Sequence, residues 1–248
     1  MRLLHISDPH LHADPAARMR GVATDATLRA VLDHAAASAV PPVAVLATGD
    51  LVQDETRAGY RRFRNLLAPL GLPVLCVPGN HDAPELMAEE LATPPFQVGG
   101  SADFGPWRVI ALSTWTAQDD GGRLADAELA RLGAALADPA PAHLLVALHH
   151  HPVPMGSQWL DGVALRNADA LFALVDGHPR VRALLWGHVH QASDRLRGGL
   201  RLLSTPSTCA QFRPGSASFA IDERPPGYRW LDLRPDGRLD TEVVWLPA

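Results

Sequence analysis

Aspartate, histidine and asparagine recur in five short clusters along the chain, and these residue types suit metal chemistry. The clusters are Asp8-Pro9-His10, Gly49-Asp50, Gly79-Asn80-His81-Asp82, His149-His150-His151 and Gly187-His188-Val189-His190. They offer carboxylate, imidazole and amide oxygen without thiolate, which suits iron, manganese or zinc rather than a cysteine–zinc centre or a calcium loop. Seven candidate ligands result: Asp8, His10, Asp50, Asn80, His149, His188 and His190. Seven groups exceed the needs of one tetrahedral ion and suit two ions that share a bridging carboxylate, as in phosphatases and nucleases.

Each cluster ends an apolar run rich in valine, leucine and isoleucine, which is typical of a strand buried on both faces. These runs span 2–7, 42–48, 72–78, 143–151 and 181–187. Helical spacing of apolar residues occupies the segments between them, at Thr24–Ala39, Arg57–Leu67, Asp126–Ala137 and Asn167–Val175. Groups just past the carboxyl ends of strands in such a sheet converge on one crevice, so the five clusters are expected to form a single site.

After residue 195 the pattern becomes β-rich. The expected strands are 200–205, 218–223, 228–233 and 241–246, with a hairpin turn at Pro235-Asp236-Gly237. We therefore predict an α/β fold in which two packed sheets are flanked by helices (αββα), with the C-terminal strands completing the second sheet. The 47% apolar composition is sufficient for one core, and residues 1–248 are expected to form a single domain.

Composition narrows the class of partner. A net charge of −5 argues against a dedicated nucleic-acid surface, which needs clustered cations. No apolar run approaches the roughly 20 residues that cross a bilayer, and the first ten residues do not resemble a signal peptide. We expect a cytoplasmic protein with a small-molecule substrate, no nucleic-acid partner and no membrane partner. Its oligomeric state is left open.

The order of the five clusters resembles the calcineurin-like metallophosphoesterase family. The resemblance implies the metallophosphoesterase-type β-sandwich and assigns Asp8, His10 and His190 to a first metal. It assigns Asn80, His149 and His188 to a second metal, with Asp50 as the catalytic bridge between them. It also gives His81 the role of a non-ligand catalytic histidine that contacts the scissile phosphate and protonates the leaving oxygen. Asn80 and His190 are expected to contact substrate beside His81.

Several longer segments are similar to the bacterial class III 3′,5′-cyclic-AMP phosphodiesterases. They are 149–161, 165–172, 187–191, 205–212 and 225–239. This resemblance implies hydrolysis of 3′,5′-cyclic AMP or a related cyclic nucleotide to the 5′-monophosphate, by attack of a hydroxide that bridges two divalent or trivalent metals. Iron and manganese are expected, with zinc as a further candidate. The alternative is a broad-range or glycerophosphodiester phosphodiesterase, whereas a non-enzymatic scaffold would be expected to lack ligands and none is missing.

Some assignments stay open from sequence. In the histidine triplet, the family pattern favours His149 as the ligand and leaves His150 in reserve. Asp54 and Asp82 are candidates to orient a histidine. Related protein phosphatases carry an aspartate where this chain has Gln53, which puts a dyad role for Asp54 in doubt. Trp115 is expected in the core, and Trp159 either stacks on a nucleobase or caps the core.

Overall fold

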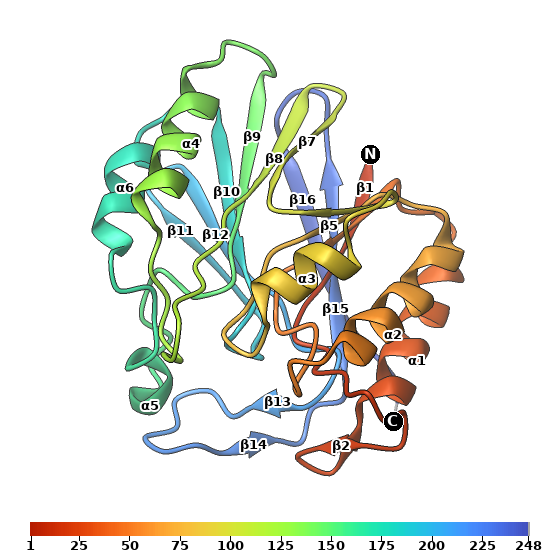
Figure 1. Cartoon of the computed structure of the whole chain (residues 1–248). Helices are drawn as coiled ribbons and strands as arrows, with labels where there is room; N and C mark the ends of the chain where they lie inside the picture. Colours follow the sequence, from red (N-terminus) through yellow and green to blue (C-terminus); the bar gives the residue numbers. More distant parts are fainter. Residues whose placement is uncertain (248) are drawn as a thin grey trace.

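Two six-stranded sheets pack face to face, and helices cover their outer faces (Figure 1). The computed structural model describes residues 1–247. The first sheet has the order β16 (Leu239–Trp245), β15 (Gly227–Leu233), β1 (Arg2–Ile6), β4 (Ala44–Ala47), β5 (Val74–Cys76), β6 (Phe96–Val98). The second has the order β11 (Ser193–Arg197), β12 (Leu200–Ser204), β10 (Val181–Trp186), β9 (His143–Ala147), β8 (Trp107–Ala111), β7 (Gly100–Phe104). Two small hairpins pair β2 (Arg18–Met19) with β3 (Val22–Ala23) and β13 (Gln211–Phe212) with β14 (Ile221–Asp222).

The helices form the outer layers. They are α1 (Thr24–Ala36), α2 (Arg57–Leu67), α3 (Pro84–Glu90), α4 (Asp126–Ala137), α5 (Gln158–Asp161) and α6 (Ala168–Val175), with a 3-10 turn at Ala68–Leu70. In Figure 1, α1 and α2 lie beside the first sheet, and α4 and α6 lie beside the second. Within residues 1–247, no helix combines the length and apolar character needed to cross a membrane.

Strand alternation divides the apolar side chains into layers. In β1, Leu4 and Ile6 pack with the residues of α1 and α2, while Leu3, which precedes Leu4, packs against the second sheet. This arrangement is expected when successive side chains of a strand point to opposite faces. The sheets therefore share one apolar interface, and each has a second apolar layer under its helices.

The predicted αββα sandwich is confirmed, and α2 and α4 have the predicted bounds. Helix α1 ends at Ala36 rather than at residue 39, and α3, α5, β6 to β8 and β11 were not predicted. One detail was wrong: β15 and β16 extend the first sheet beside β1, so of the four predicted C-terminal strands only β12 joins the second sheet. Of the predicted strand 218–223, only Ile221–Asp222 pairs. Alternation reveals a buried face but not which sheet edge a strand will join.

Candidate metal centre

The seven candidate ligands meet at one edge of the sandwich. Strands β1, β4 and β5 run parallel in the first sheet, and β9 and β10 run parallel in the second. Their carboxyl ends therefore lie at common edges, and each is followed directly by one of the polar clusters. All seven side chains except Asn80 belong to buried residues, with His188 at 7% the most exposed of the six.

The loops that carry these side chains have unusual backbone conformations. In residues 1–247, eight non-glycine residues have positive φ, and five of them are candidate ligands: Asp8, His10, Asp50, His188 and His190. The other three, Arg20, Glu55 and Gln118, line the cavities beside them. Left-handed backbone in non-glycine residues costs free energy and tends to cluster at functional sites. Its concentration here supports a functional role for this edge.

Two glycines let the loops approach one another. A Cβ at Gly79 would overlap the Asp50 carboxylate and backbone, and a Cβ at Gly187 would overlap the hydroxyl of Ser7. Side chains at these positions would therefore push apart the loops that bring the polar groups together.

Asp8, His10 and His190 form the first group of donors. The Nε2 atoms of His10 and His190 lie 3.0 Å apart, and His190 Nε2 lies 3.4 Å from Asp8 Oδ1. His190 Nδ1 donates a hydrogen bond to the carbonyl of Ala210 at 2.6 Å, so a neutral His190 carries a lone pair on Nε2. Donation from the far ring nitrogen to a carbonyl is the usual way to orient a metal-ligating histidine.

Asn80, His149 and His188 form the second group. His149 Nδ1 donates to the carbonyl of Thr48 at 2.7 Å, so its Nε2 faces Asn80 Oδ1 at 3.1 Å and His188 Nδ1 at 3.2 Å and carries a lone pair in the neutral ring. Asn80 Oδ1 also lies 2.9 Å from His188 Nδ1. Acceptor atoms this close repel one another unless a proton or a cation lies between them.

Asp50 lies between the two groups. Its Oδ1 accepts a hydrogen bond from the backbone N–H of His81 at 2.9 Å, which fixes the carboxylate. Its Oδ2 lies 3.5 Å from His149 Nε2 and 3.8 Å from His10 Nε2. One oxygen therefore faces both groups, which is the placement that a bridging ligand requires.

The electrostatics of this site favour added positive charge. Burial would raise the pKa of Asp50, but the combined attraction of His149, His81 and His10 holds this pKa well below its usual range. Conversely, burial opposes protonation of His149, yet Asp50 raises its pKa to about 9. Burial lowers the pKa of His10 to about 3, so its imidazole is neutral and able to bind a metal. A metal cation would supply the charge that the two carboxylates Asp8 and Asp50 demand, and the donor set fits such an ion.

The choice between His149 and His150 follows from their hydrogen bonds. His150 Nδ1 lies 2.7 Å from the Thr114 hydroxyl, and its Nε2 donates to the carbonyl of Asp120 at 3.1 Å. Both ring nitrogens of His150 thus have protein partners, whereas His149 keeps one nitrogen facing Asn80. The geometry favours His149 as the donor.

His81 lies at the edge of the donors and contacts Gln53. The rings of His81 and His10 have centroids 5.3 Å apart, and the Gln53 amide nitrogen lies 3.1 Å from His81 Nδ1. An amide N–H that donates to Nδ1 leaves the proton of a neutral His81 on Nε2. Gln53 was noted in the sequence only as a departure from the family pattern, and its contact with His81 was not predicted.

Asp54 and Asp82, the two candidates to orient a histidine, have other hydrogen-bond partners in the structure. Asp54 accepts hydrogen bonds from the Ala13 N–H at 2.7 Å and the Thr56 hydroxyl at 2.8 Å, and thereby ties two loops together. Asp82 is buried and accepts from the backbone N–H groups of Leu51 and Gly79. Both carboxylates turn toward backbone donors because the loops around them leave N–H groups without other partners.

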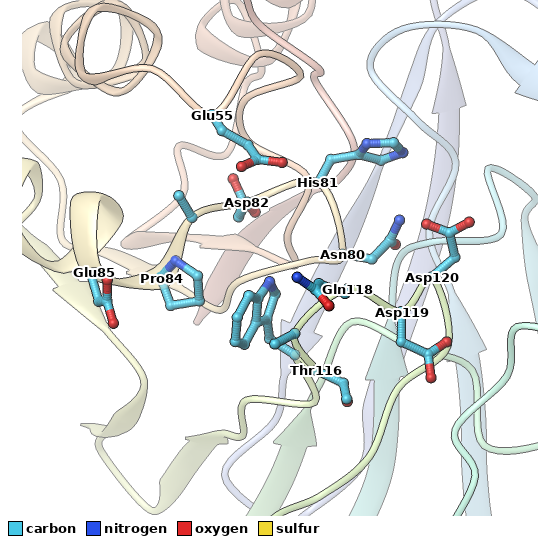
Figure 2. A pocket seen from close by; sticks show the side chains of 13 residues that line it. Glu55, Asn80, His81, Asp82, Pro84, Glu85, Thr116, Gln118, Asp119 and Asp120 are labelled. Atoms are coloured by element: carbon cyan, nitrogen blue, oxygen red, sulfur yellow. The ribbon is translucent and has the colours of Figure 1, made fainter.

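Of the cavities that adjoin the donors, two have a tryptophan in their lining. The first, of about 450 Å³, contains the half-buried Trp115 and is called here the Trp115 cavity. Figure 2 shows its side chains, with carboxylates of Glu55, Glu85, Asp119 and Asp120 around its rim and Asn80 and His81 on its inner wall. The core placement of Trp115 was therefore wrong, because this residue lies on the loop that follows β8 beyond the sheet edge.

The second cavity has a volume of about 270 Å³ and includes several of the donors. Its other wall contains Trp159, Phe212 and Phe219, which we call the aromatic cluster. Trp159 packs partly against the core of the second sheet and also lines this cavity. The contribution of Phe212 and Phe219 was not predicted, because neither follows a buried strand or belongs to a polar cluster.

The chain is similar to proteins of known family. The family described as calcineurin-like phosphoesterase matches residues 1–192. A relative from Pseudomonas aeruginosa, the 3′,5′-cyclic adenosine monophosphate phosphodiesterase CpdA, is 45% identical over 243 residues, which cover 97% of this chain and 88% of that protein. The protein of the same name from Escherichia coli K12 is 38% identical over 244 residues and covers 98% of this chain and 89% of its own length.

Among solved structures, a dimetal phosphatase from Danio rerio superposes with a TM-score of 0.62. The two proteins are 15% identical, and the match covers 93% of this chain and 94% of the other. At this identity the likeness concerns the fold, which is that of the two-sheet sandwich described above.

Proposed function

The chain belongs to the calcineurin-like phosphoesterase family, and from this premise we propose that it is a metal-dependent phosphodiesterase that hydrolyses 3′,5′-cyclic AMP to the 5′-monophosphate. The observation that carries the reaction class is the convergence of seven candidate metal ligands on one edge of the sandwich. The substrate is supported by the names of the relatives from Pseudomonas aeruginosa and Escherichia coli, which match nearly the whole chain. Residues 1–248 are proposed to act as one catalytic domain, since the donors come from both sheets.

We assign the donors to two ions. Asp8, His10 and His190 are proposed to hold one ion. Asn80, His149 and His188 hold the other, and Asp50 bridges them. When bound, such ions supply a water molecule that can be deprotonated near neutral pH and neutralise charge on phosphate oxygens. Carboxylate, imidazole and amide donors suit iron, manganese and zinc, and iron or manganese is the proposal.

His81 is proposed to serve the leaving group. Hydrolysis to the 5′-monophosphate breaks the bond between phosphorus and O3′, so O3′ must take up a proton. A neutral His81 that accepts from Gln53 at Nδ1 carries its proton on Nε2 and can donate it to O3′. Asn80 and His190 lie beside the same cavity and are proposed to contact the phosphate with His81.

A second activity is favoured by the Trp115 cavity. Its indole and the carboxylates of Glu55, Glu85 and Asp120 suit a cationic alcohol, because aromatic faces and carboxylates both attract ammonium groups (Figure 2). Glycerophosphodiesters of ethanolamine or choline carry such alcohols. Hydrolysis of cyclic AMP remains the first proposal because the relatives from Pseudomonas aeruginosa and Escherichia coli are named for that activity.

The test is metal analysis followed by a substrate panel. Freshly purified protein is expected to contain about two equivalents of metal, measured by elemental analysis. The metal-loaded enzyme is then compared on cyclic AMP, cyclic GMP and glycerophosphocholine by kcat/KM. Preference for cyclic AMP with 5′-AMP as product supports the proposal. A higher kcat/KM for glycerophosphocholine would replace it with the second activity.

A further inference from the structure

The aromatic cluster brings together two parts of the chain that are distant in sequence, helix α5 and the β13–β14 hairpin. Trp159 lies in α5, Phe212 in β13 and Phe219 in the loop between β13 and β14. The ring centroids of Trp159 lie 5.2 Å from those of both Phe212 and Phe219, and the two phenylalanines are 5.3 Å apart. All three pairs meet edge to face, with interplanar angles between 70° and 73°. Together these rings give the cavity an apolar wall against which a planar group can pack.

The cluster is joined directly to the donors. The Phe212 ring stacks on His190, with centroids 3.9 Å apart and planes within 8° of parallel. The cavity of about 270 Å³ is bounded by His10 and Asp50 on the donor side and by Trp159 and Phe219 on the aromatic side. A substrate whose phosphate lies at the donors would therefore have its remaining atoms within reach of these rings.

Resting on the proposed function, we propose that the aromatic cluster binds the nucleobase of the substrate while the cyclic phosphate lies at the donors. Phe219 is 40% exposed beside the donors, so part of its apolar surface can still be buried by a ligand with an apolar face. Phosphate and ribose lack such a face, and a purine has two. Stacking on aromatic side chains is a general way in which proteins bind bases.

Arg20 adds charge complementarity to this cavity. It stands at the turn of the β2–β3 hairpin with φ of +52°, and its guanidinium lies 4.6 Å from the centroid of Phe219. Among residues 1–247 it is the single arginine that lines this cavity, and the chain has no lysine. A phosphodiester brings one negative charge, so a cation held on Phe219 complements the substrate.

The Trp115 cavity is the competing location for the base. It offers one indole in place of three rings, and carboxylates surround it without an arginine in its lining (Figure 2). These properties suit a cationic group better than a nucleotide that carries a negative charge. Trp115 therefore provides a matched aromatic control.

The experiment compares binding of 5′-AMP and ribose 5-phosphate by calorimetry on the metal-loaded protein. Phe219→Ala is the first variant because this side chain is exposed, and Trp159→Leu is the second because it keeps an apolar contact with the core. Each is expected to lower the preference for 5′-AMP over ribose 5-phosphate by roughly 5- to 150-fold, the range for loss of one base–aromatic stack. Trp115→Ala is expected to leave the preference unchanged. Phe212 is not varied because it touches His190.

The outcomes separate the two proposals. If the wild-type enzyme hydrolyses cyclic AMP and both cluster variants keep the wild-type preference for 5′-AMP, the base site is overturned and the function stands. If only Trp115→Ala loses the preference for 5′-AMP over ribose 5-phosphate, the proposal is overturned and the base binds in the Trp115 cavity. Failure of the wild-type enzyme to hydrolyse cyclic AMP would instead overturn the proposed function. In the expected result, KM for cyclic AMP rises in the cluster variants while metal content is unchanged.

Discussion

Replacing Gln53 by alanine is expected to lower kcat for cyclic AMP without changing bound metal. The Gln53 amide nitrogen lies 3.1 Å from His81 Nδ1 and is positioned to fix the ring and its tautomer. The backbone N–H of Gln53 donates to the carbonyl of Leu11 at 2.7 Å, so the loop keeps its own hydrogen bond when the side chain is shortened. The substitution therefore removes the contact with His81 and little else.

The size of the effect follows from the strength of one partly buried, uncharged hydrogen bond. Such a bond contributes a net of about 0.5–1.5 kcal/mol, which corresponds to a loss in kcat of roughly 2- to 13-fold if it is needed equally in the transition state. Removal of His81 itself should cost more, on the order of 10²- to 10⁴-fold, because the proton donor is lost. The difference between these two values makes a double-mutant cycle informative.

The assay measures kcat and metal content for Gln53→Ala, His81→Ala and the double variant. If Gln53 acts through His81, its substitution has no further effect once His81 is alanine. Gln118→Ala, which shortens a glutamine in the wall of the Trp115 cavity, is the matched control. Equal losses from Gln53→Ala in both backgrounds would refute the positioning role. So would a fall in bound metal.

Three other variants address the bridge, the cavity cation and the fold. Asp50→Ala should abolish occupancy of both sites, and retention of about two equivalents of metal by elemental analysis would contradict the bridge. Arg20→Ala should raise KM for cyclic AMP by roughly 2- to 5-fold at low salt, which is the range for loss of an exposed ion pair. If added salt does not reduce this effect on KM, a charge interaction between Arg20 and the substrate is refuted. The Arg2 guanidinium donates two hydrogen bonds to Asp232 at 2.9 and 2.7 Å and holds the pKa of that carboxyl below its usual range. Asp232→Asn should therefore lower the free energy of unfolding in urea by about 1 kcal/mol at pH 7. The difference in unfolding free energy between wild type and Asp232→Asn should have its full size above about pH 4, the pKa of aspartate in the unfolded chain. It should disappear as the pH falls through the lower pKa of Asp232 in the folded protein. Equal stabilities at pH 7 would rule the contribution out.

The sequence was sufficient to predict which side chains meet at this edge of the sandwich, but not the hydrogen bonds that distinguish neighbouring histidines. His149 and His150 are the same residue type and both follow strand β9. They differ because one ring faces the Thr48 carbonyl and the other lies between Thr114 and Asp120, partners that come from separate loops. No local pattern carries that information.

The same limit explains the contact of Gln53 and the aromatic cluster. Gln53 reaches His81 because two strands of the first sheet end side by side, and the residue type at position 53 alone does not reveal this. Phe212 and Phe219 lie on a small hairpin without a buried strand pattern. Their contact with Trp159 therefore depends on how the roughly fifty residues between Trp159 and Phe212 fold, which local sequence does not reveal. Residues that follow strongly apolar strands were predictable because the strand fixes where they emerge.

The strained backbone links the fold to the chemistry. Left-handed conformations of non-glycine residues cost on the order of 1–3 kcal/mol each, so the five strained donors together oppose folding by an amount comparable to the net stability of many domains. Aspartate and histidine reduce that cost because they tolerate this conformation better than branched residues. The remainder is offset by burial of the strands that precede the donors, whose side chains pack between the two sheets and under the helices. The rigid sandwich thus holds the carboxylates and imidazoles at distances of 3 to 4 Å, which is the condition for a preorganised metal site.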